Sequence, residues 1–113
     1  MSTDEAAYFE RLRELQSAAW PPGIAREPHY PFGPIAISDH LREWARRQPE
    51  KPACIFYGRT ITYRELDDLS ERFAGLLHEK GVRPGDRVAV YLPNCPQFIL
   101  AFFGILKLGA VHV

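Results

Sequence analysis

The chain has 113 residues, and 14 Lys and Arg residues balance 14 Asp and Glu residues, so the formal net charge is zero. Its 46% hydrophobic and 25% charged residues are typical of a globular domain, which excludes disorder along the whole length. A neutral chain lacks the basic face of a dedicated nucleic-acid binder, and no apolar run reaches the roughly 18 residues of a transmembrane segment.

The first five residues are acidic and contain no apolar core of a secretory signal. The two cysteines, Cys54 and Cys95, are too far apart to form a metal-binding C-x-x-C motif. We therefore expect a cytoplasmic protein with two reduced thiols. Peripheral association with a membrane is left open as an alternative.

Residues 4–19 are predicted to form an amphipathic helix that packs on the body of the protein, because its apolar side chains recur at helical spacing. Ser2 and Glu5 have the spacing of a capping box at its start. The apolar stripe consists of Tyr8, Leu12, Leu15 and Ala19. The following segment, 20–34, contains five prolines and is expected to lack regular structure.

A second helix is predicted to begin at Ser38, as its N-cap, and to end at Pro49. Its expected buried stripe is Leu41, Trp44 and Ala45. The next segment has the composition of a β-hairpin, with strands 53–57 and 60–62 joined by a turn at Gly58 and Arg59.

Thr62 and Glu65 form a predicted capping box for a third helix, 63–80, and Gly81 is expected to end it. The expected apolar face is Leu66, Leu69, Phe73, Leu76 and Leu77. Three carboxylates occur on the same segment: Asp67, Asp68 and Glu71. We interpret them as a solvated charged face, with Asp68 pairing to Arg64 and Arg72, and metal binding as the minor alternative.

A strand at 87–92, a helix at 97–108 and a strand opening at 110–113 predict a βαβ unit with parallel strands. The apolar run of the first strand is typical of a strand buried on both faces. The predicted fold class is therefore α/β, with a β-hairpin and a βαβ unit. The predicted helix 97–108 is apolar around nearly its whole circumference, so other parts of the protein must cover it on all sides. We therefore expect the N-terminal portion of a larger domain with a mixed or parallel sheet; the alternative is an oligomer that buries this helix between copies.

Little catalytic chemistry is recognisable in these residues. The chain contains no G-x-x-x-x-G-K-[ST] phosphate loop, no G-x-G-x-x-G motif and no G-x-S-x-G elbow. The four histidines are scattered without partner spacing: His29, His40, His78 and His112. No catalytic, cofactor-binding or metal-binding residue is assigned.

Four ordered segments between Ile37 and Val113 resemble the start of the AMP-forming acyl-CoA synthetase family, which includes adenylation domains of peptide synthetases. The matching segments are 62–66 (TYREL), 81–89 (GVRPGDRVA), 92–98 (LPNCPQF) and 106–111 (LKLGAV). Leu92-Pro93-Asn94 followed by Phe98 is more similar to the fatty-acyl-CoA ligase branch.

The resemblance implies an enzyme that activates a fatty acid with ATP and Mg²⁺ to an acyl-adenylate, and then transfers the acyl group to coenzyme A. It also implies that the catalytic motifs lie outside these residues, so this segment is scaffold, inactive alone, and binds no cofactor. Residues 1–34 would be a lead-in and 35–113 the start of the large adenylate-forming domain. A homodimer is a further expectation. Two alternatives stay open: an adenylating enzyme for an aryl or amino acid, and a stand-alone non-enzymatic oligomerisation or binding module.

Overall fold

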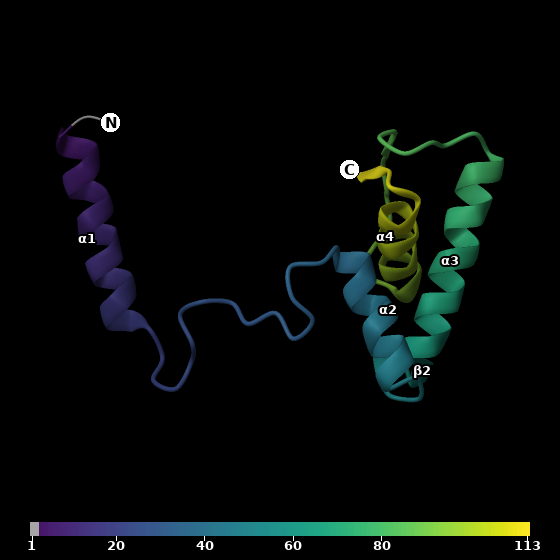
Figure 1. Cartoon of the computed structure of the whole chain (residues 1–113), viewed down its shortest axis with the longest axis horizontal. Helices are drawn as coiled ribbons and strands as arrows, with labels where there is room; N and C mark the ends of the chain where they lie inside the picture. The colour runs from purple at the N-terminus through teal and green to yellow at the C-terminus, as the bar shows by residue number, and fades with distance from the viewer. Residues whose placement is uncertain (1–2) are drawn as a thin grey trace. The chain divides into compact units, whose positions relative to one another are not determined.

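The computed structural model describes residues 3–113, which divide into two compact units (Figure 1). The first unit ends at Pro31 and the second runs from Phe32 to Val113.

The first unit is a helix followed by an irregular, proline-rich segment, as the sequence predicts. Helix α1 spans Thr3–Ala19. After it, the Trp20 indole donates a hydrogen bond of 2.8 Å to the carbonyl oxygen of Ile24. Tyr8 and Leu15 of the apolar stripe are 61% and 52% exposed, so packing of this helix on the rest of the protein stays a prediction. The predicted Ser2 cap lies outside the described residues.

The second unit contains three helices that pack against one another and two small sheets (Figure 1). Its elements in chain order are α2 (Ile37–Arg47), β1 (Pro52–Phe56), β2 (Arg59–Thr62), α3 (Tyr63–Glu79), β3 (Arg87–Val88), α4 (Pro96–Leu108) and β4 (Val111–His112). β1 and β2 pair antiparallel, whereas β3 and β4 pair parallel on either side of α4 in the chain. The predicted α/β class, the hairpin and the βαβ unit are confirmed.

The hairpin turn lies one residue earlier than predicted. Phe56 pairs with Arg59, so the two loop residues are Tyr57 and Gly58 rather than Gly58 and Arg59. Both have positive φ, 46° and 79°, as a type I′ turn requires. Tyr57 therefore has a left-handed conformation that asparagine or glycine usually adopts. The prediction placed the turn one residue later because it took Gly58 as the first loop residue.

Helix α2 does not begin with a serine cap. Its N-cap is Ala36, which accepts hydrogen bonds from the amides of Asp39 and His40 but has no capping side chain. Ser38 lies inside the first turn and is 5% exposed, so the prediction that it is the N-cap was wrong. Packing outweighs capping here, because Ser38 lies on the same buried side as Leu41 and Ala45.

Helix α3 has both predicted ends. The Thr62 hydroxyl accepts from the Glu65 amide, and the Glu65 carboxylate accepts from the Thr62 amide. At the other end, Gly81 has φ 94°, and the Val82 amide donates to the Leu77 carbonyl in a Schellman motif. The apolar face is only partly as predicted, because Leu69 and Leu76 are 36% and 47% exposed.

Strand β3 is shorter than the predicted strand 87–92. The ladder to β4 extends only to the hydrogen bond from the Val90 amide to the Val113 carbonyl, and Tyr91 and Leu92 are exposed. The expectation of burial on both faces is therefore wrong within these residues. Among the strands of residues 3–113, β3 pairs only with β4, so its other edge has no neighbour strand.

Helix α4 forms the centre of the core. Ala101, Gly104 and Ile105 are buried, and Ile105 is fully enclosed. The other apolar side chains of this helix are half-buried, so the second unit covers α4 only in part. Among residues 3–113, none of the helices combines the length and the apolarity needed to cross a bilayer.

Candidate functional site

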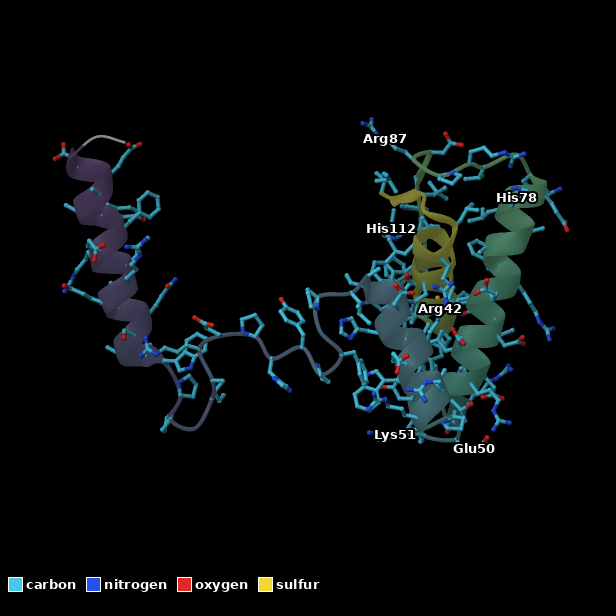
Figure 2. All side chains as sticks on the ribbon, in the orientation of Figure 1. Arg42, Glu50, Lys51, His78, Arg87 and His112 are labelled. Carbon is cyan, nitrogen blue, oxygen red and sulfur yellow. The ribbon has the colours of Figure 1, made fainter. Side chains whose placement is uncertain are left out.

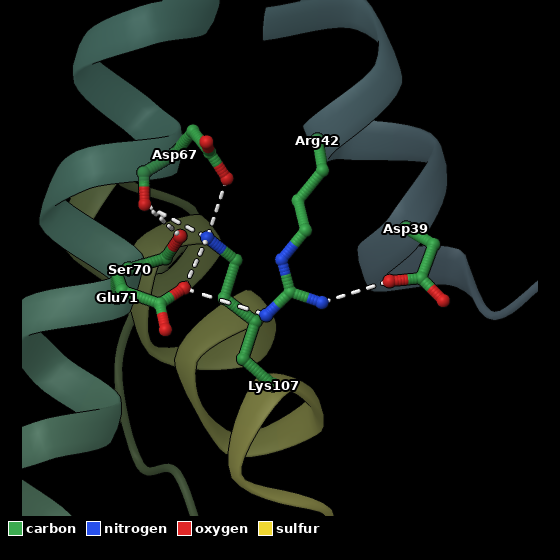
Figure 3. Close-up of polar contacts among 6 residues, drawn as sticks. All are labelled: Asp39, Arg42, Asp67, Ser70, Glu71 and Lys107. Atoms are coloured by element: carbon green, nitrogen blue, oxygen red, sulfur yellow. Dashed lines mark hydrogen bonds and ion pairs between the residues drawn. The ribbon is translucent and has the colours of Figure 1, made fainter.

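A buried lysine joins two helices and is the most prominent polar feature of the second unit (Figure 3). The side chain of Lys107, on α4, is 1% exposed. Its Nζ lies 2.5 Å from Oδ1 and 2.8 Å from the carbonyl oxygen of Asp67 on α3. It also lies 3.2 Å from Oε2 of Glu71. These three acceptors use all three donors of the ammonium group.

An arginine of α2 completes the network from its other side. Arg42 Nη2 lies 3.4 Å from the same Glu71 oxygen, and its Nη1 donates to Asp39 Oδ1 at 2.8 Å (Figure 3). In addition, the Ser70 hydroxyl, which is fully buried, donates to the Asp67 carbonyl at 3.0 Å. The cluster of Lys107, Asp67, Glu71 and Arg42, here called the lysine clamp, thus connects all three helices of this unit.

The charges in the lysine clamp stabilise one another. The hydrogen bond from Lys107 is the main cause that lowers the pKa of Glu71, against the opposing effect of partial burial, and Arg42 adds to it. The hydrogen bond to Asp39 is the main cause that raises the pKa of Arg42. Two cations therefore share the Glu71 carboxylate, which stays ionised well below neutral pH.

The interpretation of the three carboxylates as a solvated face holds for Asp68 and Glu71, whose side chains are 55% and 62% exposed, although Glu71 also pairs with Lys107. It was wrong for Asp67, whose carboxylate is 31% exposed and binds the buried Lys107. The predicted pair of Asp68 with Arg72 is confirmed at 3.0 Å, but Arg64 pairs with Glu50 instead. In the sequence, the available indication of this ion pair was Lys107 itself, because it is the one charged residue of the largely apolar helix α4. Within the described part of the chain, no group of three or more metal-ligating side chains occurs.

An apolar pocket of about 280 Å³ lies among the hairpin, α3 and the start of α4. Its apolar lining consists of Phe56, Ile61, Leu66, Leu69, Pro96 and Leu100. In the described part of the chain, Arg59 and Gln97 are the two polar residues of this lining. Because the lining has one cation and no carboxylate, the pocket is suited to an apolar group that carries negative charge.

The remaining candidate residues do not form a catalytic group. Cys54 and Cys95, both half-buried free thiols, line one pocket of about 320 Å³, a proximity that the sequence did not predict. His78 and His112 lie on different elements (Figure 2). The His112 ring makes edge-to-face contacts with the rings of Phe98 and Phe102, at centroid distances of 5.6 and 5.2 Å. Its Nε2 is buried, and within residues 3–113 it has no hydrogen-bond partner.

Known proteins are similar to this chain in sequence and in fold. The chain is 35% identical over 96 residues to a long-chain-fatty-acid–CoA ligase of Bacillus subtilis, covering 85% of this chain and 17% of the ligase. It is 40% identical over 77 residues to triostin synthetase I of Streptomyces triostinicus, covering 68% of this chain and 15% of the synthetase. The chain therefore spans about a sixth of the length of these curated relatives.

A solved structure has the same fold. The N-terminal subdomain of Klebsiella oxytoca NpsA, in complex with 3-hydroxyanthranilyl-AMSN, superposes with a TM-score of 0.67 at 35% identity and covers 69% of this chain and 20% of that one. The family model described as AMP-binding enzyme matches residues 41–113, from the buried stripe of α2 to the end of β4. The match includes the hairpin, the lysine clamp residues of α3 and α4, and the βαβ unit, and the chain thus belongs to the family of AMP-binding enzymes.

Proposed function

We propose that this chain is the N-terminal scaffold of an AMP-forming acyl-CoA synthetase that acts on a fatty acid. The family match over residues 41–113 is the observation that carries the proposal. The similarity to a long-chain-fatty-acid–CoA ligase, and the Leu92-Pro93-Asn94 segment followed by Phe98, favour a fatty acid as substrate. Residues 35–113 begin the large adenylate-forming domain, and residues 1–34 are its lead-in.

The proposed reaction has two steps. A carboxylate oxygen of the acid attacks the α-phosphorus of ATP, which gives an acyl-adenylate and releases pyrophosphate. The thiol of coenzyme A then attacks the acyl carbon and displaces AMP, which gives the thioester. Both steps require stabilisation of negative charge as it develops on oxygen.

The lysine clamp does not fit an ATP, Mg²⁺ or coenzyme A site of such an enzyme. Lys107 and Arg42 already neutralise Glu71, and every donor of the Lys107 ammonium is used within the protein. No step is therefore assigned to this chain, and its proposed part is structural, with the lysine clamp holding α3 and α4 together. We place the cofactor sites outside residues 35–113.

The test compares the 113-residue chain with the protein translated from its whole open reading frame. Each is incubated with ATP, Mg²⁺, coenzyme A and one acid from a panel of fatty, aryl and amino acids, and pyrophosphate release is measured. We expect release from the whole translated protein with fatty acids, and none from the 113 residues alone. Pyrophosphate release by the short chain would refute its role as scaffold.

Two other functions have separate outcomes in the same experiment. The NpsA complex, with its 3-hydroxyanthranilyl group, supports an aryl acid as the first alternative. Release only with an aryl or amino acid would assign the enzyme to that class. An open reading frame that stops after Val113 would instead favour a stand-alone binding or oligomerisation module.

We also propose a cytoplasmic homodimer in which residues 1–34 contribute to the contact. The exposed apolar side chains of α1, among them Tyr8, Phe9 and Leu15, support this assignment. Sedimentation of the whole translated protein with and without residues 1–34 tests it. We expect the shortened protein to sediment as a monomer; an unchanged dimer mass would contradict the proposal.

A further inference from the structure

The pocket between the hairpin and α4 has an uncompensated positive charge. Within residues 3–113, no hydrogen bond or ion pair holds the Arg59 guanidinium, although it lines the pocket. The arginines of the neighbouring helix differ in this respect, because Arg64 pairs with Glu50 and Arg72 with Asp68. Arg59 is therefore a cation available to a ligand.

The start of α4 adds to the positive potential. Pro96 and Gln97, its first two residues, line the same pocket, and the first turn contains no acidic residue. The N-cap residue, Cys95, makes no side-chain capping hydrogen bond. The partial positive charge of the helix N-terminus is thus not neutralised by the helix itself.

The rest of the pocket favours an apolar chain. Leu66 is 5% exposed, whereas Leu69 and Phe56 are each 36% exposed, so the lining combines a buried leucine with apolar side chains that solvent reaches. A volume of about 280 Å³ is near the lower end of small-molecule sites, which span roughly 300–1,000 Å³. This size suits one chain of medium length better than a bulky ring system.

We propose that this pocket is a binding site for a free medium-chain fatty carboxylate, with the alkyl chain among the leucines and the carboxylate on Arg59. Among residues 3–113, no group that could activate the acid lines the pocket, and the proposed site is a non-catalytic one. It goes beyond the proposed function, because binding here requires neither ATP nor coenzyme A. Charge complementarity separates this ligand from a neutral or cationic chain of equal length.

Calorimetric titration of the 113-residue chain with decanoate, below its micelle concentration and without nucleotide, tests the site. Octanoate, decanol and decyltrimethylammonium are the comparison ligands. We expect each methylene removed from the chain to weaken binding by up to about fourfold, from the burial of apolar surface. Decanol and the ammonium compound are expected to bind at least tenfold more weakly than decanoate, because neither pairs with a guanidinium.

Two variants and a matched control locate the site. Arg59→Gln is expected to weaken decanoate binding about tenfold while leaving decanol unchanged. Leu69→Gln, at a partly exposed helix position, is expected to weaken both ligands. Arg87→Gln, which removes another exposed arginine far along the chain on β3, is expected to change neither.

The proposal is overturned if decanol binds as tightly as decanoate, if Arg59→Gln retains wild-type affinity, or if Arg87→Gln weakens binding as much as Arg59→Gln. Thermal unfolding of each variant confirms that the fold is intact. This test is independent of the proposed enzymatic function. If decanoate binds but the whole protein releases no pyrophosphate, the binding site is supported and the proposed enzymatic function is refuted.

Discussion

Gly104 of α4 lies so close to Phe73 of α3 that a β-carbon on the glycine would stand 2.7 Å from the Cδ1 atom of the phenyl ring. It would also stand 2.9 Å from the Ser70 carbonyl oxygen, which is backbone and cannot rotate away. The two helices therefore approach each other at a position where only hydrogen fits. This contact lies one turn of α4 from Lys107, so close packing and the lysine clamp act on the same pair of helices.

Gly104→Ala is expected to destabilise the fold by about 1–3 kcal/mol, because one methyl group overpacks the contact between α3 and α4. Gly75→Ala is the matched control: Gly75 is also helical, and a β-carbon there meets nothing within 4 Å. That substitution is expected to stabilise the chain by up to about 1 kcal/mol through helix propensity. Urea unfolding of the two variants measures the contrast, and equal effects would contradict the helix-contact argument.

Lys107→Met is expected to destabilise the fold by about 1–3 kcal/mol, since it removes the hydrogen bonds from Nζ to Asp67 and the ion pair with Glu71, and leaves the Asp67 carboxylate without its cation. The methionine has nearly the same length, so loss of volume contributes little. Lys80→Met, at the exposed C-cap of α3, is the control and is expected to cost less than about 0.5 kcal/mol. Equal losses in both variants would show that the clamp adds no stability.

The free energy of unfolding at acidic pH is expected to depend on the protonation of Glu71. Its pKa in the folded chain is lowered by the hydrogen bond from Lys107, from an ordinary value of 4.5. A lowered folded pKa means that the unfolded chain takes up the proton first as the pH falls. The stabilisation is therefore complete above about pH 4.5 and is lost as the pH drops through the folded pKa.

Glu71→Gln tests this dependence by urea unfolding between pH 7 and pH 3. The variant is expected to be less stable than the wild type at pH 7, by no more than about 1 kcal/mol, because the side chain is 62% exposed and water screens the pair. The difference should shrink as the pH falls below 4.5. Glu79→Gln, at the last turn of α3, serves as the control. A difference that stays constant with pH would exclude the ion pair as its cause.

The features that the sequence predicted well depend on near neighbours in the chain. The capping box of Thr62 and Glu65 and the Schellman end at Gly81 follow from hydrogen bonds between residues a few positions apart. The βαβ unit follows from an apolar strand, a helix and a second strand in succession. The family resemblance, confirmed by the match over residues 41–113, rests on segments of this local kind.

The features that the sequence did not predict join residues far apart in the chain. Lys107 meets Asp67 across 40 positions, and no spacing rule relates them. The exclusion of a side chain at Gly104 depends on Phe73, on another helix. The N-cap of α2 was misplaced because Ser38 is buried by tertiary contacts, which capping preferences do not include. Apolar and charged patterns thus indicate the elements, whereas the partners across elements require the structure.

Substitutions at Thr62 test local stabilisation apart from contacts between helices, because the Thr62 hydroxyl bonds to the Glu65 amide within the first turn of α3. Thr62→Ala removes the bond to the Glu65 amide, 3.2 Å long, and is expected to cost about 1 kcal/mol. Thr62→Ser keeps a capping oxygen and is expected to remain within about 0.5 kcal/mol of the wild type. Ser38→Ala removes a hydroxyl from a position that does not cap α2, so no capping loss is expected there. Unfolding free energies in urea decide the matter: a Thr62→Ser variant as unstable as Thr62→Ala would mean that the threonine methyl group, and not the cap, stabilises the start of this helix.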